Sequence, residues 1–286
     1  MILVFGRSGQ VAQELARQEA AAEFVGRDAF DLGDPGEGGV RLHDWIMARA
    51  PSAIINAAAY TAVDRAEEEE DLATRVNGLA PAAMAQACAA LGIPLVHIST
   101  DYVFDGAGET PFVPHHPPAP LGAYGRSKLA GEKGVRAAGA TFAILRTSWV
   151  FSAHGSNFVR TMLRLGAERD SLRVVADQIG GPTPASAIAA ACLQTLGRLQ
   201  ADPALSGTYH FSGAPATSWA GFARAIMAEA GLACLIEDIP TADYPTPARR
   251  PLNSRLDCST LARLGLSQPE WRAALPQTIR ELKGRI

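Results

Sequence analysis

A tyrosine and a lysine four residues apart, Tyr124 and Lys128, have the residue types and the spacing for proton transfer at a carbonyl group. Residues four apart on a helix share one face, so the two side chains would be neighbours. A phenol titrates near pH ~10 in water, and a nearby cation favours its ionised form. Only three of the 26 basic residues are lysines, which suggests that position 128 needs a compact, tunable charge. The alternative is that Tyr124 and Lys128 are only neighbours on a helix face and have no catalytic role.

Thr100 adds a third candidate for the same chemistry. It follows the apolar run Pro94–Ile98, which predicts a strand with Thr100 at its carboxyl end. Ligands of open α/β sheets bind at that end of the strands. There, Thr100 could hold a substrate oxygen beside the phenol of Tyr124 while a cofactor transfers a hydride. The sequence therefore predicts Thr100, Tyr124 and Lys128 as the catalytic residues.

A glycine turn near the N-terminus indicates a dinucleotide site. Residues 2–5 are apolar without alternation, as in a buried parallel strand, and Gly6-x-x-Gly9-x-x-Ala12 follows them directly. Glycines let the backbone approach a pyrophosphate, and the start of a helix favours its negative charge. Because the spacing differs from the commoner GxGxxG pattern, an ordinary strand–helix turn remains the alternative.

The segment after the second expected strand bears on the choice of cofactor. An acidic residue there binds the ribose hydroxyls of NAD, whereas a basic residue suits the phosphate of NADP. Arg27 and Asp28 offer both, and Arg7 adds a second base. We therefore expect NADPH, with NADH as the alternative. Asp31 and Leu32 would flank the adenine or would be ordinary loop residues.

The first half of the chain alternates strands and helices, which predicts a doubly wound parallel α/β sheet. Strands are expected at residues 2–5, 23–26, 53–56, 94–100 and 142–148, and helices at 40–50, 72–91 and 125–138. The acidic run Glu67–Asp71 is expected to be a solvated helix start. The expected domains are a dinucleotide-binding domain at 1–150, to which part of about 185–212 returns, and a smaller substrate domain at 151–286.

The loops of the C-terminal domain would form a cleft with the sheet, which is the usual place for a substrate. One of these loops, residues 244–251, is rigid and basic. Its Arg249 and Arg250 would either hold a phosphorylated ligand or be simply solvated.

Composition excludes several classes of protein. Hydrophobic residues make up 48% of the chain and charged residues 19%, so a sizeable core is expected. A net charge of −3 argues against a nucleic-acid binder. The four cysteines lie apart, and three of them have apolar surroundings that suggest buried thiols. His115 and His116 lack a third ligand nearby, so no metal site is expected. The chain opens without a basic leader and its apolar runs are short, so we expect a soluble, cytoplasmic protein without a membrane partner.

Together these motifs resemble the extended short-chain dehydrogenase/reductases, with their Rossmann-type fold, and most closely the dTDP-4-dehydrorhamnose reductase family. The resemblance rests on the stretches GRSGQVAQEL, NAAAYTAVDRAE, HISTDYVFDG, YGRSKLAGE, LRTSWVF, NFVRTMLRL, DQIGGPTPA and YPTPARRPLNSRL. It implies that NADPH or NADH delivers a hydride to C4 of dTDP-4-dehydro-6-deoxy-L-mannose. The product would be dTDP-L-rhamnose, in the last step of its synthesis.

The resemblance also implies roles for individual residues. Tyr124 would give the proton to the C4 oxygen, Lys128 would hold the nicotinamide ribose and lower the phenol's pKa, and Thr100 would bind the substrate oxygen. Thr100, Asp101 and Trp149 would contact the nucleotide sugar. Besides Tyr124 and Lys128, the cofactor would be bound by Gly6, Gly9, Gln10, Val11, Arg27, Asp31, Leu32, Ala59, Tyr60, Thr61 and Ile98.

The sequence also departs from the family pattern. Some members dimerise through a magnesium ion held by glutamates. Glu14 fits one such position, but Ser186 stands at another and the chain ends too early for a third. We therefore expect a monomer or a homodimer without a bridging metal. Two alternatives to the function remain: a reductase of another nucleotide-linked ketosugar, and a non-catalytic regulatory subunit like the methionine adenosyltransferase beta subunit. The complete Thr100, Tyr124 and Lys128 set favours an enzyme.

Overall fold

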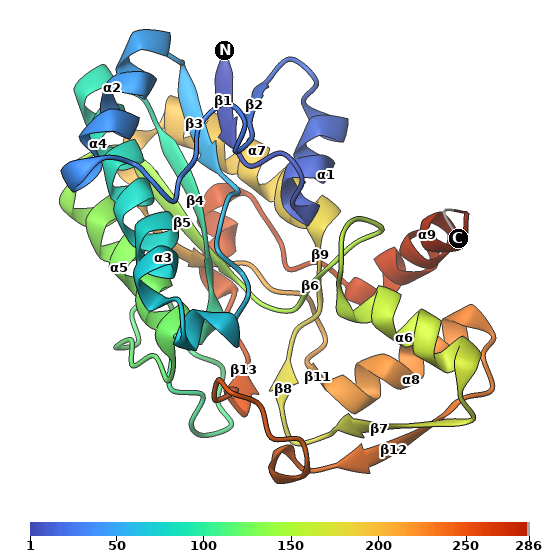
Figure 1. The fold of residues 1–286 in the computed structure, drawn as a ribbon. Coiled ribbons are helices and arrows are strands. Elements are labelled where there is room, and N and C mark those ends of the chain that lie inside the picture. Colours follow the sequence, from blue (N-terminus) through green and yellow to red (C-terminus); the bar gives the residue numbers. More distant parts are fainter. Residues whose placement is uncertain (285–286) are drawn as a thin grey trace.

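The computed structural model describes residues 1–284, and within them a six-stranded parallel sheet has the order β10-β5-β4-β3-β1-β2 (Figure 1). Its strands are β1 (Ile2–Phe5), β2 (Glu23–Val25), β3 (Ala53–Asn56), β4 (Leu95–Thr100), β5 (Phe142–Thr147) and β10 (Gly207–His210). The chain passes from β1 to β2 on one side and returns to β3 on the other. The strand order therefore reverses between β1 and β3, and ligands of such sheets bind at this crevice.

Alternate residues of the strands face two different layers of helices. Val4 packs with α1 (Gln10–Gln18) and α7 (Ala185–Ala201) on one face. Leu3 packs with α2 (Val40–Arg49), α4 (Ala80–Leu91) and α5 (Ala123–Ala137) on the other. Burial on both faces explains why the strands are continuously apolar. The predicted doubly wound α/β fold is confirmed.

The helix predicted at residues 72–91 begins earlier and is not uniform. It consists of α3 (Glu70–Thr74), a π-helical turn at Arg75–Leu79, and then α4. π-Helical turns are frequent at functional sites. This one contains the buried Asn77. The helix predicted from residue 125 begins at Ala123.

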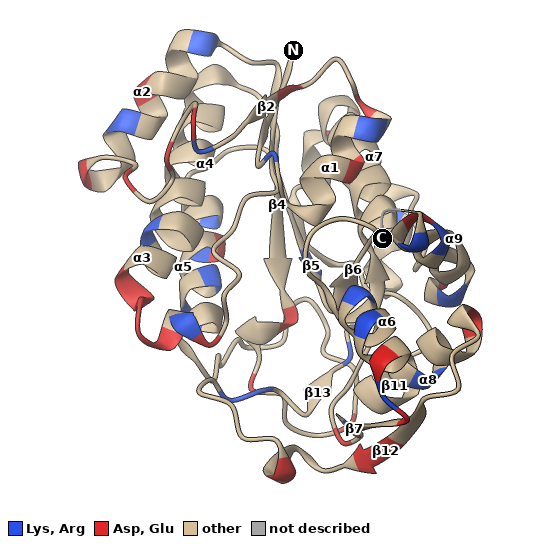
Figure 2. Ribbon diagram, turned by 45° about the vertical axis from the view of Figure 1, so that its right-hand side comes forward, with Lys and Arg blue, Asp and Glu red and all other residues tan. Residues whose placement is uncertain are grey.

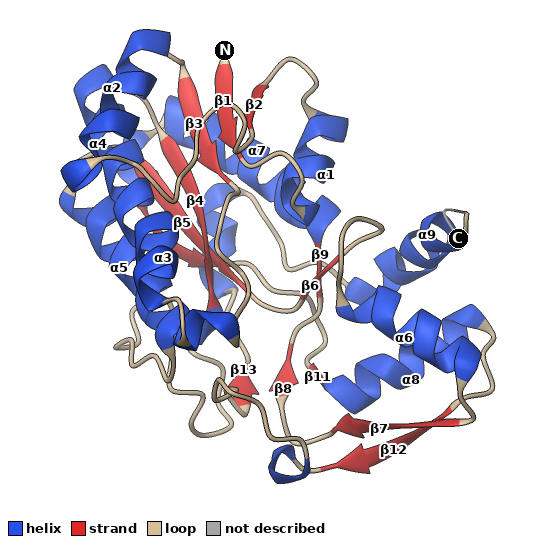
Figure 3. Cartoon of the chain, viewed as in Figure 1, coloured by secondary structure: helices blue, strands red, loops and turns tan. Residues whose placement is uncertain are grey.

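The C-terminal part has its own apolar core, which includes the buried side chains of Phe222 and Trp271. There α8 (Trp219–Ala230) packs against both α6 (Phe158–Glu168) and α9 (Trp271–Lys283) (Figure 3). Its elements are β6 (Val150–Phe151), α6 (Phe158–Glu168), β7 (Ser171–Val175), β8 (Ile179–Gly180), β9 (Thr183–Pro184), β11 (Thr217–Ser218), α8 (Trp219–Ala230), β12 (Leu235–Ile239), β13 (Asn253–Ser254) and α9 (Trp271–Lys283). Between these elements the chain returns to the large sheet, where β10 pairs with β5 and α7 packs on α1.

Three of the four cysteines are buried, and one of the two adjacent histidines packs against an aromatic ring. The thiols of Cys88, Cys192 and Cys234 are free and buried, as their apolar neighbours predicted. His116 packs edge-on against the ring of Phe112. Across residues 1–284, no helix has the length and apolar character needed to cross a membrane.

Candidate active site

Thr100 lies at the carboxyl end of β4, as predicted. Its hydroxyl accepts the N–H of Tyr102 at 3.2 Å and donates to the Asp101 carboxylate at 3.0 Å. Thr100 and Asp101 are 6% and 3% exposed. Burial raises the pKa of the Asp101 carboxyl to about 6. The end of β4 therefore carries a fixed hydroxyl beside a carboxyl group of raised pKa.

Tyr124 lies in the first turn of α5, and two glutamates of the acidic run Glu67–Asp71 contact that turn. The Ala123 N–H donates to Glu67 Oε1 at 2.9 Å, and the Arg126 guanidinium donates twice to the Glu70 carboxylate, at 2.7 and 2.8 Å. The run is red in Figure 2, and α3 packs against α5. The predicted helix start within this run is confirmed, since α3 begins at Glu70, and Glu67 is exposed. The two glutamates also contact the first turn of α5, and the start of a helix favours carboxylates.

Lys128 lies one turn after Tyr124 and is 2% exposed. Its ammonium group donates to the Ile98 carbonyl at 2.7 Å. Burial lowers the pKa of this group to about 8, although the nearby Glu132 carboxylate opposes the shift. Because Ile98 belongs to β4, Lys128 connects α5 to the strand that carries Thr100.

Glu132, one turn further along α5, forms a buried ion pair with Arg146 of β5. The guanidinium donates to both carboxylate oxygens, at 2.8 and 2.6 Å, and the Ser99 hydroxyl donates at 2.6 Å. Burial favours a raised pKa for Glu132, but Arg146 and Ser99 outweigh it and lower the pKa to about 2. This network attaches α5 to β4 and β5, and so fixes Tyr124 relative to Thr100.

The phenol of Tyr124 is protonated at neutral pH. Burial and the Asp101 carboxylate raise its pKa, while a hydrogen bond with Thr100 opposes the shift. The direction is opposite to the lowering expected from Lys128, because burial disfavours the phenolate more strongly. A neutral phenol in contact with Thr100 can donate a proton to an oxygen that gains negative charge.

The glycine turn after β1 has the shape of a phosphate site. Gly6 has φ +110°, and a Cβ there would lie 3.2 Å from the backbone of Ala57 and Ala58. No atom of the described chain lies within 4 Å of a Cβ built on Gly9, and no side chain caps the first turn of α1. The N–H groups of that turn are therefore available to an anion. Val11 is buried in the core, so only its backbone can take part.

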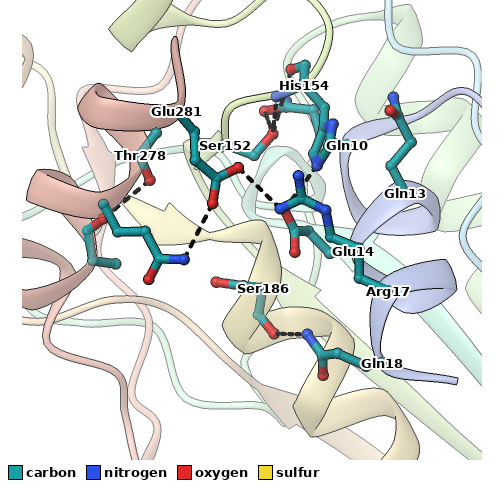
Figure 4. Close-up of polar contacts among 12 residues, drawn as sticks. Gln10, Gln13, Glu14, Arg17, Gln18, Ser152, His154, Ser186, Thr278 and Glu281 are labelled. Carbon is teal, nitrogen blue, oxygen red and sulfur yellow. Dashed lines mark hydrogen bonds and ion pairs between the residues drawn. The ribbon is translucent and has the colours of Figure 1, made fainter. Parts of the chain in front are cut away.

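The Gln10 side chain extends from this turn toward the C-terminal part (Figure 4). Its amide oxygen accepts from the Ser152 hydroxyl at 2.9 Å, and its amide nitrogen donates to the Val150 carbonyl at 3.4 Å. One turn later, Glu14 and the His154 imidazole lie 2.9 Å apart. Gln10 can thus offer its backbone to a phosphate while its side chain joins α1 to the segment after β5.

Arg17 lies between two carboxylates at the far end of α1. Its guanidinium is 3.3 Å from Glu14 and 3.0 Å from Glu281 of α9 (Figure 4). Ser186, at the start of α7, accepts from Gln18 through its carbonyl. In residues 1–284 we find no group of three or more His, Cys, Asp or Glu side chains placed to hold a metal ion.

The segment Ala59–Thr61, after β3, is held by Asn77 of the π-helical turn. The Asn77 amide accepts the Tyr60 N–H at 2.8 Å and donates to the Tyr60 carbonyl at 3.0 Å. It also donates to the Ser127 hydroxyl of α5 at 3.0 Å. Since β3 neighbours β1, the segment lies beside the glycine turn.

The residues expected near the adenine follow β2, at the edge of the sheet. Arg27 and Asp31 are exposed, whereas Leu32 is buried in the core. Arg7 and Asp28 form an exposed ion pair of 2.7 Å beside them. Apart from Tyr124 and Lys128 of α5, the expected cofactor residues thus lie at or just after the carboxyl ends of the neighbouring strands β2, β1, β3 and β4, along which an extended dinucleotide would lie.

Trp149 is held in an unusual backbone conformation, with φ +49°. Its ring stacks on Trp219 with centroids 3.7 Å apart, and it covers Gly180, where a Cβ would lie 2.7 Å from the ring. Trp219 also lines a cleft of about 780 Å³, which Tyr102 and Arg250 line as well. This volume is in the range of small-molecule sites.

Sequence reasoning missed the tertiary contacts of five residues: Glu67, Glu70, Glu132, Arg146 and Trp219. One signal was present for Glu132. It continues the spacing of Tyr124 and Lys128, so all three share one face of α5.

The chain is similar over nearly its whole length to proteins of one family. The family described as RmlD substrate binding domain matches residues 1–283. A dTDP-4-dehydrorhamnose reductase of Burkholderia thailandensis is 46% identical, with 98% of each chain covered, and one of Escherichia coli is 38% identical over 98% of this chain and 97% of its own. The crystal structure of a dTDP-4-dehydrorhamnose reductase from Bacillus anthracis in complex with NADP has a TM-score of 0.88 at 34% identity and 98% coverage of both chains. The resemblance stated from the sequence is confirmed.

Proposed function

The chain belongs to the RmlD substrate binding domain family, and we propose that it reduces the C4 ketone of dTDP-4-dehydro-6-deoxy-L-mannose to give dTDP-L-rhamnose. The observation that carries this proposal is the meeting of Thr100, Tyr124 and Lys128 between the end of β4 and the start of α5. Its support also includes the near-complete alignment with proteins named dTDP-4-dehydrorhamnose reductase.

NADPH is the proposed cofactor, with NADH as a second, weaker one; when bound, it supplies the hydride. The relative from Bacillus anthracis was crystallised with NADP. The backbone of Gly9, Gln10 and Val11 would bind the pyrophosphate, and Arg27 the NADP phosphate. The remaining cofactor contacts are proposed for Gly6, Asp31, Leu32, Ala59, Tyr60, Thr61, Ile98, Tyr124 and Lys128.

Each catalytic side chain has one task in this proposal. Thr100 orients the C4 oxygen through its hydroxyl. Tyr124 donates its proton to that oxygen as negative charge develops there, because an alkoxide is a much stronger base than a phenolate. The Lys128 ammonium group binds the nicotinamide ribose and stabilises the phenolate that remains. Asp101 and Trp149 bind the sugar.

We also propose where the protein acts, what it binds and how its chain is divided into domains. We place it in the cytoplasm, with a nucleotide sugar as the partner and with no nucleic acid or membrane involved. The division into a dinucleotide-binding domain at 1–150 and a substrate domain at 151–286, with β10 and α7 in the first domain, is our assignment. The protein would be a monomer or a homodimer.

The test is turnover by the purified protein. The ketosugar nucleotide is made in situ by the upstream enzymes, NADPH is added, and the absorbance of the reduced nicotinamide is followed. The expected result is a loss of absorbance that requires the sugar and yields dTDP-L-rhamnose, with a slower loss with NADH. No loss with either cofactor, in a protein that binds both, would contradict the proposal and favour another ketosugar or a regulatory role.

A further inference from the structure

The loop 244–251 of the C-terminal part makes two hydrogen bonds to one carboxylate of the large sheet domain. The Ala248 N–H donates to Asp64 Oδ1 at 3.2 Å, and the Arg250 guanidinium donates to Asp64 Oδ2 at 2.7 Å. The end of the loop packs closely on Gly106, where a Cβ would lie 2.4 Å from Pro251. These contacts place Arg250 where the two parts of the chain meet.

Arg250 and its neighbour Arg249 have different environments. The Arg250 side chain is 20% exposed and lines the cleft of about 780 Å³, as do Asp64 and Tyr102. The Arg249 side chain is exposed on the surface. The sequence left open whether this pair holds a phosphorylated ligand or is solvated, and the structure gives the two arginines different surroundings.

Tyr102 contacts both Arg250 and Tyr124, the proposed proton donor. The Arg250 guanidinium lies 3.4 Å from the Tyr102 hydroxyl, and the rings of Tyr102 and Tyr124 meet edge to face with centroids 5.4 Å apart. In a hexose, C1 lies across the ring from C4. A sugar whose C4 oxygen contacts Tyr124 would therefore direct its C1 substituent away from Tyr124, across the width of a ring. In a nucleotide-linked sugar that substituent is the diphosphate.

We propose that Arg250 binds the diphosphate of the nucleotide-linked sugar and that Asp64 is the positioning residue for its guanidinium. The proposal rests on the proposed function. A guanidinium has five N–H donors in a rigid fork, and such forks bind phosphate oxygens in pairs. One N–H group donates to Asp64 and another points at the Tyr102 hydroxyl, so further donors remain for the ligand. The pairing also offsets the charge of a carboxylate that would otherwise repel an anion in this cleft.

The direct test is binding of dTDP, measured by titration calorimetry on the intact protein and its variants. We expect Arg250→Ala to weaken dTDP binding about 10- to 100-fold, the range for losing a charge-assisted hydrogen-bond pair. The matched control, Arg249→Ala, should bind dTDP within about twofold of the parent. Equal weakening by both variants, or parental affinity in Arg250→Ala, would overturn the assignment.

Two further measurements separate the alternatives. NADPH affinity should be unchanged in Arg250→Ala, and a loss there instead would assign the arginine to the cofactor's phosphates and overturn the proposal. If Arg250→Ala does not fold, Arg250→Lys keeps the charge but removes the fork. It should weaken dTDP binding about tenfold, and parental affinity in that variant would count against the proposal.

The role of Asp64 is tested by Asp64→Asn, which keeps the shape of the side chain. We expect KM for the ketosugar to rise about three- to tenfold, with kcat and NADPH affinity unchanged, since only the orientation of Arg250 is lost. An unchanged or lowered KM would overturn the positioning role. Because dTDP binding needs no turnover, failure of the proposed reaction and failure of this inference give different results.

Discussion

The candidate active site lies between two walls that are built in opposite ways. The wall that carries Tyr124 and Lys128 is buried and is cross-linked by Glu132 and Arg146. The opposite wall is formed by α6, the start of α8, short strands and the loop 244–251, whose Tyr244 is 60% exposed. Reacting groups need fixed positions, because small displacements cost large factors in rate. Groups that only bind the rest of a substrate can be carried by loops. Substitutions in the first wall should therefore affect rate and stability, and those in the second should affect affinity.

Removal of the proton donor should have the largest effect. Tyr124→Phe keeps the ring and its edge contact with Tyr102 but removes the hydroxyl. We expect kcat to fall about 10²- to 10⁴-fold, which is the usual contribution of a positioned acid. The circular dichroism spectrum should be unchanged, because the ring still fills the same partly buried site. A variant with near-parental kcat would exclude Tyr124 as the donor.

Breaking the buried ion pair between Glu132 and Arg146 should lower the free energy of unfolding. Glu132→Gln leaves the Arg146 guanidinium buried without its counter-charge, so we expect the free energy of unfolding to fall by about 3–5 kcal/mol in urea denaturation. The control is Glu168→Gln, which removes an exposed pair with Arg164 and should change stability little. Equal effects of the two variants would show that the network does not stabilise α5.

The lowered pKa of Lys128 predicts a pH limit on activity. Its ammonium group is held near a pKa of about 8, down from 10.5, so the charge that supports the phenolate is lost above pH 8. We expect kcat/KM to fall toward tenfold per pH unit there. Between pH 8 and 10.5 the unfolded chain binds more protons than the folded one, so this group makes the free energy of unfolding rise with pH. A flat activity profile to pH 9.5 would contradict this role.

The smallest effect is expected in the second wall. Trp219→Ala removes the ring on which Trp149 stacks, a contact worth about 0.5–1.5 kcal/mol. We expect KM for the ketosugar to rise about two- to tenfold with kcat nearly unchanged, as steady-state kinetics would show. A large loss of kcat with constant KM would place Trp149 in the rigid half of the site instead.

The sequence was sufficient for the features that depend on local pattern. The buried strands β1 and β3 and the end of β4 at Thr100 lie where the apolar runs predicted them. The sequence was insufficient where the contacts or the pKa of a side chain depend on residues that are distant in the chain. Glu67 and Glu70 resemble solvated charges until α5 is placed beside them, and the sign of the Tyr124 pKa shift depends on burial, which spacing alone does not reveal. The π-helical turn around Asn77 has no clear sequence signal either.

Transfer of a labelled hydride tests the central claim most directly. The protein is given the ketosugar nucleotide and NADPH that carries deuterium at both C4 positions of the nicotinamide, and the product is analysed by mass spectrometry and NMR. Our account predicts dTDP-L-rhamnose with one deuterium, bound to C4 of the sugar. Product without deuterium at C4, or no product from a protein that binds both ligands, would contradict it.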